Sequence, residues 1–117
     1  MKIVKLEEGK WIKANGYFKK ILLAENDLKS SGNVIQIVKA EKGTSIKPHY
    51  HKRTSEVFYI LKGNGILFVG NNKERRKEGD VIFCEPGETH GVINDTGEDF
   101  VWLVFKINFT ENDTFWD

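Results

Sequence analysis

The stretch GTSIKPHYHKRTSEVFYILKG, residues 43–63, carries two of the three histidines of the chain and begins and ends with a glycine. Pro48 disfavours a helix for the residue before it and lacks the N–H of a regular ladder, so an extended segment is expected. Side chains of a strand alternate between its two faces, so His49 and His51 project side by side. A short turn, KRTS, then allows Glu56 to begin an antiparallel strand next to the two imidazoles.

The spacing of this histidine pair is compatible with two interpretations. Two imidazoles on one face of a strand can chelate a single ion, but an HxH pair at a strand end can also be exposed and bind nothing. The third histidine, His90, lies far along the chain, after the turn PGET. From spacing alone, both a metal site and a pair of surface histidines remain open.

The rest of the chain has the pattern of an all-β domain. Eleven glycines separate short segments rich in Val, Ile, Phe and Tyr, and segments of this composition favour strands. We expect ten strands, at 2–6, 17–24, 33–40, 45–51, 56–61, 65–69, 73–77, 80–85, 90–94 and 100–108. Between them, 25–31 is expected to form only a short helical turn, and Asn71-Asn72 a tight hairpin turn. Ten short strands without a long helix favour a small barrel or sandwich.

Length and composition exclude several classes of function. The 117 residues fit one domain, and charged residues make up 30% of the chain but leave a net charge of only +1. This balance gives no electrostatic reason to expect nucleic acid or a membrane surface as a partner. No apolar run is long enough for a membrane span or a secretory signal. A single cysteine, Cys84, suits a reducing compartment, so a cytoplasmic location is expected.

The strand expected at 100–108, FVWLVFKIN, is apolar on both faces. A strand of this kind must be covered twice, once by its own core and once by either the N-terminal strands or a second subunit. We therefore expect a homodimer. The tail, 109–117, ends in Phe115 and Trp116, which are expected to pack back on the barrel or on a neighbouring subunit. In the strand expected at 100–108, one face carries Val101, Leu103 and Phe105, and the other carries Phe100, Trp102 and Val104.

Two segments of the chain, 43–63 and 79–94, resemble the two motifs of the cupin family. The first motif, G-x5-H-x-H-x3,4-E-x6-G, is matched by Gly43, His49, His51, Glu56 and Gly63. The second motif, G-x5-P-x-G-x2-H-x3-N, is matched by Gly79, Gly87, His90 and Asn94. Its proline position is held by Glu85, and the proline stands one place later, at Pro86. The glycine-to-histidine spacing is unchanged, so this shift affects the local turn more than the placement of His90.

The resemblance implies a fold and a metal site. The fold is a small double-stranded β-helix, a jelly-roll barrel, in a single domain: N-terminal strands and a loop at 1–32, the conserved barrel at 33–108, and a C-terminal tail at 109–117. Three imidazoles and one carboxylate suit Fe, Mn, Ni, Co, Cu or Zn and disfavour Ca. Four protein ligands leave positions open for a substrate oxygen or dioxygen. The implied ligands of this one divalent ion are His49, His51, Glu56 and His90.

Strict alternation of side chains extends the site into a pocket. Phe58 and Ile60 are expected on the side of Glu56, and Lys47 on the side of His49. Apolar lining with few polar groups is usual for small-molecule sites. Lys47 is either a partner for a substrate anion or a solvent-facing lysine at the barrel rim. Tyr50 and Tyr59 fall on the opposite face, away from the ligands.

The resemblance implies three kinds of function. The first is an enzyme acting on a small oxygenated metabolite, as a dioxygenase or as a sugar or keto-acid isomerase. The second is a non-catalytic small-molecule binding or sensing protein with the same metal site, and in the third the ion only stabilises the barrel. Proton-transfer chemistry needs a titratable group besides the metal ligands. The sequence offers few, which favours redox or binding chemistry.

Overall fold

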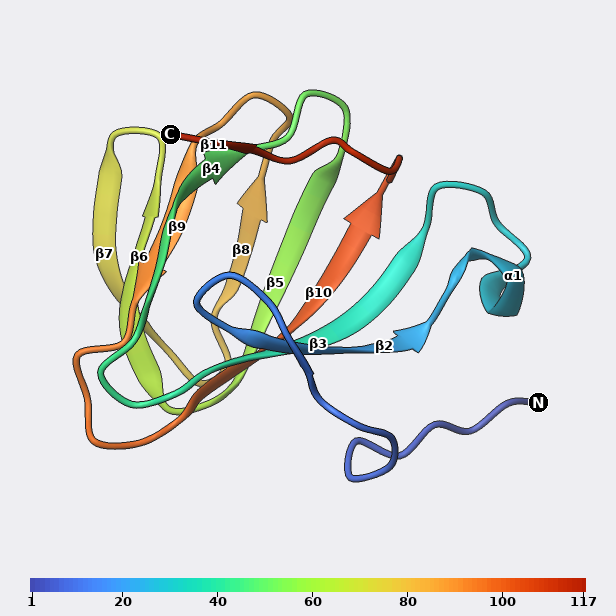
Figure 1. Cartoon of the computed structure of the whole chain (residues 1–117), viewed down its shortest axis with the longest axis horizontal. Helices are drawn as coiled ribbons and strands as arrows, with labels where there is room; N and C mark the ends of the chain where they lie inside the picture. The colour runs from blue at the N-terminus through green and yellow to red at the C-terminus, as the bar shows by residue number, and fades with distance from the viewer.

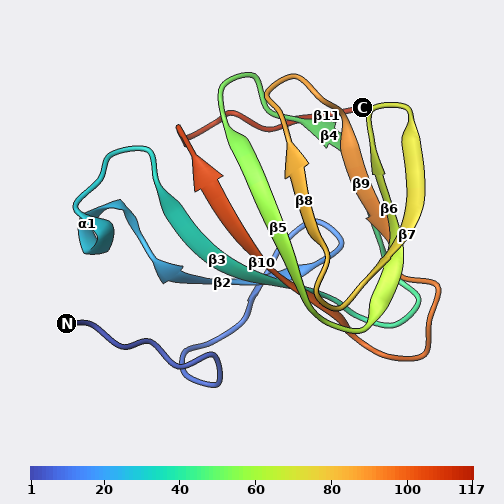
Figure 2. The same ribbon diagram turned by 180° about the vertical axis from the view of Figure 1, so that it is seen from behind.

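Two antiparallel sheets face each other across the core in the computed structural model, which describes all of residues 1–117 (Figures 1 and 2). The first sheet has the strand order β1-β2-β3-β10-β5-β8, and the second β11-β4-β9-β6-β7. The expected double-stranded β-helix is confirmed. The elements are β1 Ile12–Lys13, β2 Phe18–Leu23, α1 Glu25–Leu28, β3 Val34–Ala40, β4 Ser45–Tyr50, β5 Ser55–Lys62, β6 Asn64–Val69, β7 Asn72–Lys77, β8 Val81–Cys84, β9 His90–Ile93, β10 Phe100–Ile107 and β11 Phe115–Trp116.

The strand expected at 2–6 does not form. The backbone makes a turn there instead, in which the Glu8 N–H donates to the Lys5 carbonyl at 3.1 Å. The other nine expected strands are present with ends within one residue of the expected ones, and the short helical turn is α1. Two strands were not expected, β1 and β11. Each has two residues, too few for an alternating pattern to be visible in the sequence.

The N-terminal segment packs on the outer face of β2. Lys20 donates to the carbonyl oxygens of Leu6 and Glu8, the latter at 3.2 Å. Its ammonium group also lies 4.5 Å from the centre of the Trp11 ring. Buried Lys20 is therefore satisfied by backbone acceptors and an aromatic face. This lysine holds the segment on the sheet.

The hairpin between β6 and β7 turns one residue earlier than expected. Val69 pairs with Asn72, so the two turn residues are Gly70 and Asn71. Gly70 has a φ of 58°, a value that glycine adopts without the steric cost of a Cβ. Asn72 is therefore the first residue of β7 and not a turn residue.

Strand β4 departs from regular alternation next to Pro48. Ile46 pairs with Val92 and His49 with His90, and the register shifts between these two pairs. Ile46, which is buried, and His49, which is half-buried, consequently both face the interior although they are three residues apart. Proline cannot donate to the ladder, which is a common reason for such an irregularity. The assumption of strict alternation at β4 was wrong on this point.

Strand β10 is central in the first sheet, and its residues lie on the two faces as its sequence predicted. Phe100, Trp102 and Val104 are buried in the core. On the outer face, Phe105 remains 38% exposed. The N-terminal segment covers only the β2–β3 end of this outer face, as Figure 2 shows. The expected N-terminal cover is therefore incomplete over β10, β5 and β8.

The C-terminal tail packs back on the barrel, as expected. Its last strand, β11, pairs with β4, with Phe115 opposite Tyr50 and Trp116 opposite His49. The single helix, α1, has four residues, and no helix of the protein is long and apolar enough to cross a membrane.

Candidate metal centre

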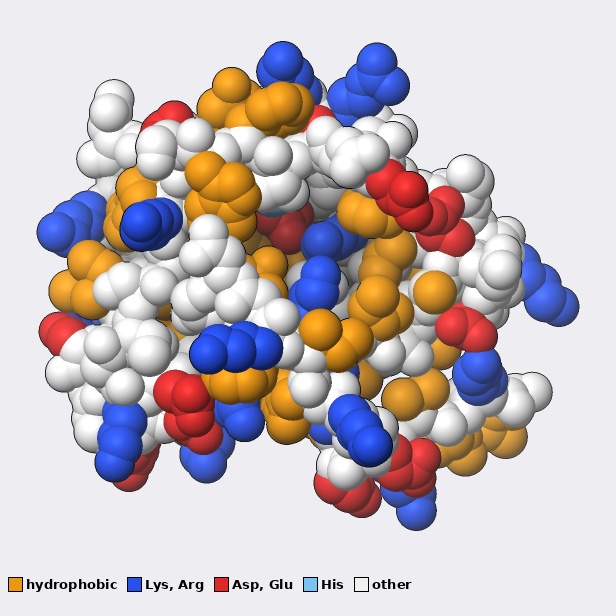
Figure 3. Space-filling view, in the orientation of Figure 1, with side chains coloured by type: hydrophobic (Ala, Val, Ile, Leu, Met, Phe, Trp, Pro, Cys, Tyr) orange, Lys and Arg blue, Asp and Glu red, His pale blue; other side chains and the backbone are white.

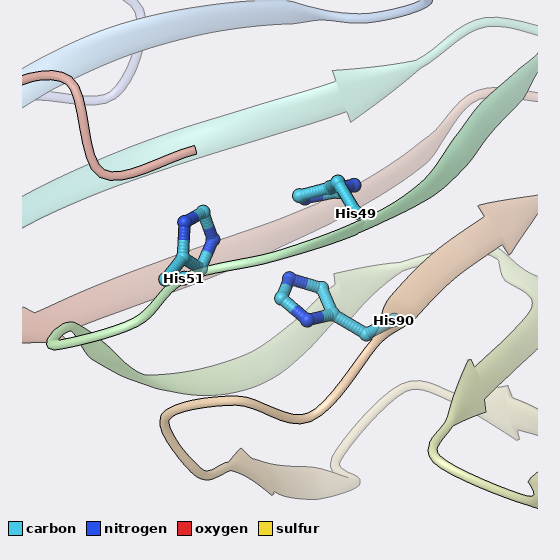
Figure 4. A group of neighbouring side chains, drawn as sticks. All are labelled: His49, His51 and His90. Carbon is cyan, nitrogen blue, oxygen red and sulfur yellow. The ribbon is translucent and has the colours of Figure 1, made fainter. Parts of the chain in front are cut away.

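The three histidines of the chain meet at one end of the barrel interior (Figure 4). His49 lies in β4, His51 directly after it, and His90 begins β9. One nitrogen from each ring lies within 4.8 Å of the others, and the ring centres of His49 and His90 are 4.4 Å apart. His49 and His90, 41 positions apart in sequence, thus lie in one cluster because β4 pairs with β9.

Glu56 completes this cluster from the opposite sheet. Its side chain is buried, and one carboxylate oxygen lies 2.8 Å from Nε2 of His51 and 3.1 Å from Nε2 of His90. Glu56 is the second residue of β5, so the turn after His51 brings it back beside the rings. All four residues implied as ligands by the sequence motifs lie together.

Each imidazole is oriented by a backbone carbonyl at its Nδ1 atom. The partners are Lys47 for His49 at 2.8 Å, Asp113 for His51 at 2.9 Å, and Glu88 for His90 at 3.1 Å. A carbonyl only accepts, so each Nδ1 carries the hydrogen and a neutral ring has its lone pair on Nε2. The Nε2 atoms of His51 and His90 are buried and have no partner with hydrogen-bond geometry. This arrangement is typical of histidines that bind a metal through Nε2.

Electrostatics at the cluster favour a charged Glu56 carboxylate and a neutral His49 imidazole. Burial by itself would raise the pKa of Glu56, but its contacts with His51 and His90 outweigh burial and hold the pKa well below its usual range. Burial, helped by the charge of His90, lowers the pKa of His49 to about 4. For His51 burial acts in the same direction, but Glu56 outweighs it and raises the pKa. The donor set, one carboxylate with imidazole nitrogens, suits a divalent transition metal.

Asp113 fastens the turn that joins His51 to Glu56. Its carboxylate accepts hydrogen bonds from the backbone N–H groups of residues 52, 53 and 54 and from the Thr54 hydroxyl, each at 2.9 Å. Burial would raise the pKa of Asp113, but these donors lower it to about 2. Sequence reasoning missed this residue, because nothing local in the tail indicates that its partners lie 59 to 61 positions away.

Trp116 and Gly87 also support the cluster. The Trp116 ring centre lies 4.6 Å from that of His49, which limits rotation of the imidazole. The Gly87 N–H donates to the His51 carbonyl at 2.6 Å, so the second motif is bonded directly to the first. Gly87 has a φ of 85°, which a turn following Pro86 requires. The displaced proline is accommodated in this turn, and Glu85 points to solvent.

A cavity lies beside the cluster, with about 360 Å³ of space that includes its open mouth. Of the three expected pocket residues, only Phe58 lines it. Ile60 packs deeper in the core, and Lys47 is exposed because of the irregularity in β4. Ile46 takes the inward position instead. The lining residues are Tyr17, Gln36, Val38, Ile46, His49, Glu56, Phe58, His90, Gly91, Val92, Trp102 and Val104.

Two polar side chains of this cavity were missed by sequence reasoning, Tyr17 and Gln36. Burial, followed by the charge of Glu56, raises the pKa of the Tyr17 hydroxyl, so this group keeps its hydrogen and can donate it to a ligand. Tyr50 stacks on Phe115 and Tyr59 is exposed, so both lie away from the ligands as expected. No short motif marks Tyr17, since its position depends on the curvature of the sheet.

The thiol of Cys84 lies in the core near the cluster. It is buried, and its backbone pairs with that of Glu56. Burial, with smaller effects of Glu56 and Glu88, raises the pKa of the thiol. A neutral buried thiol is unreactive and acts as a small apolar side chain.

A double-stranded β-helix with three histidines and a glutamate clustered in its interior defines a class of small barrel proteins. The family model of the cupin domain matches residues 36–106, and the chain belongs to this family.

Related proteins agree with this assignment. The chain is 29% identical over 86 residues to an oxalate-binding protein of Thermotoga maritima, covering 74% of this chain and 71% of that protein. It is 31% identical over 97 residues to an uncharacterized protein of Methanocaldococcus jannaschii, covering 80% and 78% of the two chains. The crystal structure of a predicted oxalate decarboxylase from Thermotoga maritima superposes with a TM-score of 0.83 at 24% identity, covering 91% of this chain and 98% of that one. This last likeness concerns the fold.

Proposed function

We propose that the protein binds one divalent transition metal ion through His49, His51, Glu56 and His90 and acts on a small oxygenated metabolite. The observation that carries this proposal is the orientation of the imidazoles. Three backbone carbonyls hold the three Nδ1–H groups, which leaves the Nε2 side of each ring available for one ion beside a charged carboxylate. The reaction classes proposed are those of a dioxygenase or of a sugar or keto-acid isomerase.

The side chains of the cavity have separate roles in this proposal. A bound ion acts as a Lewis acid that polarises a substrate carbonyl or hydroxyl, and iron also supports chemistry with dioxygen. The Tyr17 hydroxyl and the Gln36 amide orient the ligand by hydrogen bonds. Phe58 and Trp102, whose ring centres are 6.2 Å apart, exclude water from the interior end. The small apolar space suits a ligand of a few heavy atoms.

A second candidate function is ligand binding or sensing without turnover. It is favoured by the absence of a free base among the residues that line the cavity. Apart from the four proposed ligands, the only titratable side chain there is Tyr17, and its raised pKa makes it a hydrogen-bond donor. General base catalysis needs a group that takes up a proton near the working pH.

The test begins with elemental analysis of protein purified without an affinity tag. We expect close to one equivalent of a first-row transition metal per chain. Oxygen consumption by the iron-loaded protein, measured with an oxygen electrode and a panel of small oxo and hydroxy acids, then separates a dioxygenase from an isomerase or a binding protein. Oxalate is included because of the Thermotoga maritima relative. A protein that neither contains nor takes up a transition metal would refute the proposal.

We also propose a homodimer formed through the outer apolar face of β5, β8 and β10. The centre of this face consists of two rows of paired residues without a charged group. A second copy presents the same uncharged surface, and two-fold dimers are the commonest oligomers. Patches of this kind are rarely left in water. The rows are Leu103, Tyr59 and Val81, and Phe105, Val57 and Phe83.

The dimer is tested by placing charge on this face. Tyr59 and Phe83 are 45% and 53% exposed, so replacing both by lysine leaves the core intact. The wild type is expected to show twice the chain mass of 13.5 kDa in light scattering coupled to size exclusion, and the double variant the single mass. Ile12→Lys, at an exposed position of β1, is the control and should remain dimeric. A monomeric wild type would contradict the proposal.

A further inference from the structure

Lys106 lies beside the histidine–glutamate cluster and has no anionic partner for its charge. Its backbone pairs with that of Glu56, and residues directly opposite in neighbouring strands place their side chains on the same face. On β10 that is the interior face, which also carries buried Trp102 and Val104. Lys106 is half-buried, while both of its neighbours in sequence are exposed. Its side chain therefore lies on the same interior face as that of Glu56, which lines the cavity.

The ammonium group of Lys106 forms no ion pair and no hydrogen bond with the protein. Its one specific contact is with the Phe109 ring, whose centre lies 5.0 Å from Nζ. Glu56 is the nearest acid by register, but it forms no ion pair with Lys106, and one of its carboxylate oxygens is in contact with both His51 and His90. A partly desolvated ammonium without an anion is unfavourable. The ammonium group of Lys106 is thus available to bind an anion.

Lys19 adds a second positive charge on the same interior face. Its backbone pairs with that of Val38, a core residue, and the side chain is half-buried without an ion pair. Burial lowers the pKa of Lys106, and the charge of Lys19 adds to this effect against the opposing effect of Glu56. The two ammonium groups are therefore within electrostatic reach of each other. Figure 3 shows Lys or Arg side chains beside a hollow at whose bottom acidic atoms are visible.

The net charge of the metal-loaded site also favours an anionic ligand. A divalent ion bound by three neutral imidazoles and one carboxylate keeps a positive charge, and Lys106 and Lys19 add to it. A concave site with an excess of one sign of charge attracts ligands of the opposite sign. A neutral sugar would leave this excess uncompensated, whereas a carboxylate would pair with it.

We propose that Lys106, assisted by Lys19, binds the carboxylate of an anionic ligand whose other oxygen atoms face the metal. The substrate class is a small carboxylic acid with an oxo, hydroxy or second carboxylate group. This inference rests on the proposed function, since it assigns a ligand to the same cavity. It also replaces Lys47, which faces solvent, as the residue that recognises an anion.

The inference is tested by titration calorimetry of metal-loaded protein with malonate and with pyruvate. Replacing Lys106 by methionine is expected to weaken binding of both anions about tenfold to a hundredfold, the effect of losing a hydrogen bond to a charged group. Lys106→Arg should retain part of the affinity, and Lys19→Met should cost less than Lys106→Met. Malonamide and pyruvamide, which are neutral, should bind equally to wild type and Lys106→Met.

Controls separate loss of the anion site from loss of the fold or of the metal. Lys62→Met removes an exposed lysine at the end of β5 and should leave malonate binding unchanged. Melting temperature and metal content of Lys106→Met should equal those of the wild type. Unchanged malonate and pyruvate affinities in Lys106→Met, or no binding of either anion to the metal-loaded wild type, would overturn the inference. If no metal can be loaded, the proposed function fails, and the same titrations on metal-free protein decide the lysine site.

Discussion

Replacement of both His51 and His90 by alanine is expected to reduce the metal content of the purified protein to background. The two Nε2 atoms lie within about 3 Å of one Glu56 oxygen, so removing both rings leaves at most two of the four proposed ligands. Two ligands on opposite sheets form an incomplete site from which a divalent ion dissociates readily. Elemental analysis of tag-free protein measures the loss.

A second double variant, with glutamine at positions 51 and 90, tests the loss of metal in a protein that is expected to fold. The alanine variant leaves the buried Glu56 carboxylate without its partners, which can cost about 3–5 kcal/mol. Glutamine at both positions retains amide donors toward Glu56 but offers only weak metal ligands, so the folded protein should still lack metal. Glu85→Gln, which removes an exposed carboxylate in the second motif, is the matched control and should keep its metal. Full metal content in the folded glutamine variant would end the site hypothesis.

Asp113→Ala is expected to lower both the stability of the barrel and its affinity for metal. The substitution leaves three backbone N–H groups and the Thr54 hydroxyl without their acceptor. Partial hydration compensates some of these losses, and we expect a net decrease of about 2–3 kcal/mol in the free energy of unfolding. The loosened turn also carries His51 at one end and Glu56 at the other, so metal affinity should fall about tenfold or more.

Urea denaturation of the metal-free protein and competition with a chromogenic chelator measure the two effects separately. Asp117→Ala removes an exposed carboxylate from the same tail and should change neither. Asp113→Asn keeps one acceptor oxygen and should fall between wild type and alanine. Wild-type stability together with wild-type affinity in Asp113→Ala would contradict the role assigned to the tail.

Local patterns predicted most of the fold. Apolar alternation and glycine punctuation placed nine strands with ends within one residue of the structure, because most of these strands have one buried face and the period of two is then strongly expressed. The pattern failed at 2–6, where three apolar residues stand among lysines but pair with no strand. It also failed for β1 and β11, whose existence depends on their partners β2 and β4.

The cluster of His49, His51, Glu56 and His90 was anticipated from the resemblance to the cupin motifs, and the structure brings these four residues together. The pocket was anticipated less well. The position of a residue in a strand predicts the face on which its side chain lies only while strand pairing is regular. The register shift next to Pro48 turns Lys47 outward. Lys106 was not singled out, because its position beside Glu56 follows from the pairing of β10 with β5.

The sequence by itself determined the fold class and the strands, because these depend on periodicity over short distances, and its resemblance to the two cupin motifs indicated the residues of the histidine–glutamate cluster. Only the tertiary structure decided which groups surround that cluster. Asp113, Trp116, Tyr17 and Lys106 reach it through pairing and packing between segments that are distant in the chain. Such contacts depend on the packing of the whole barrel, so no local sequence pattern predicts them.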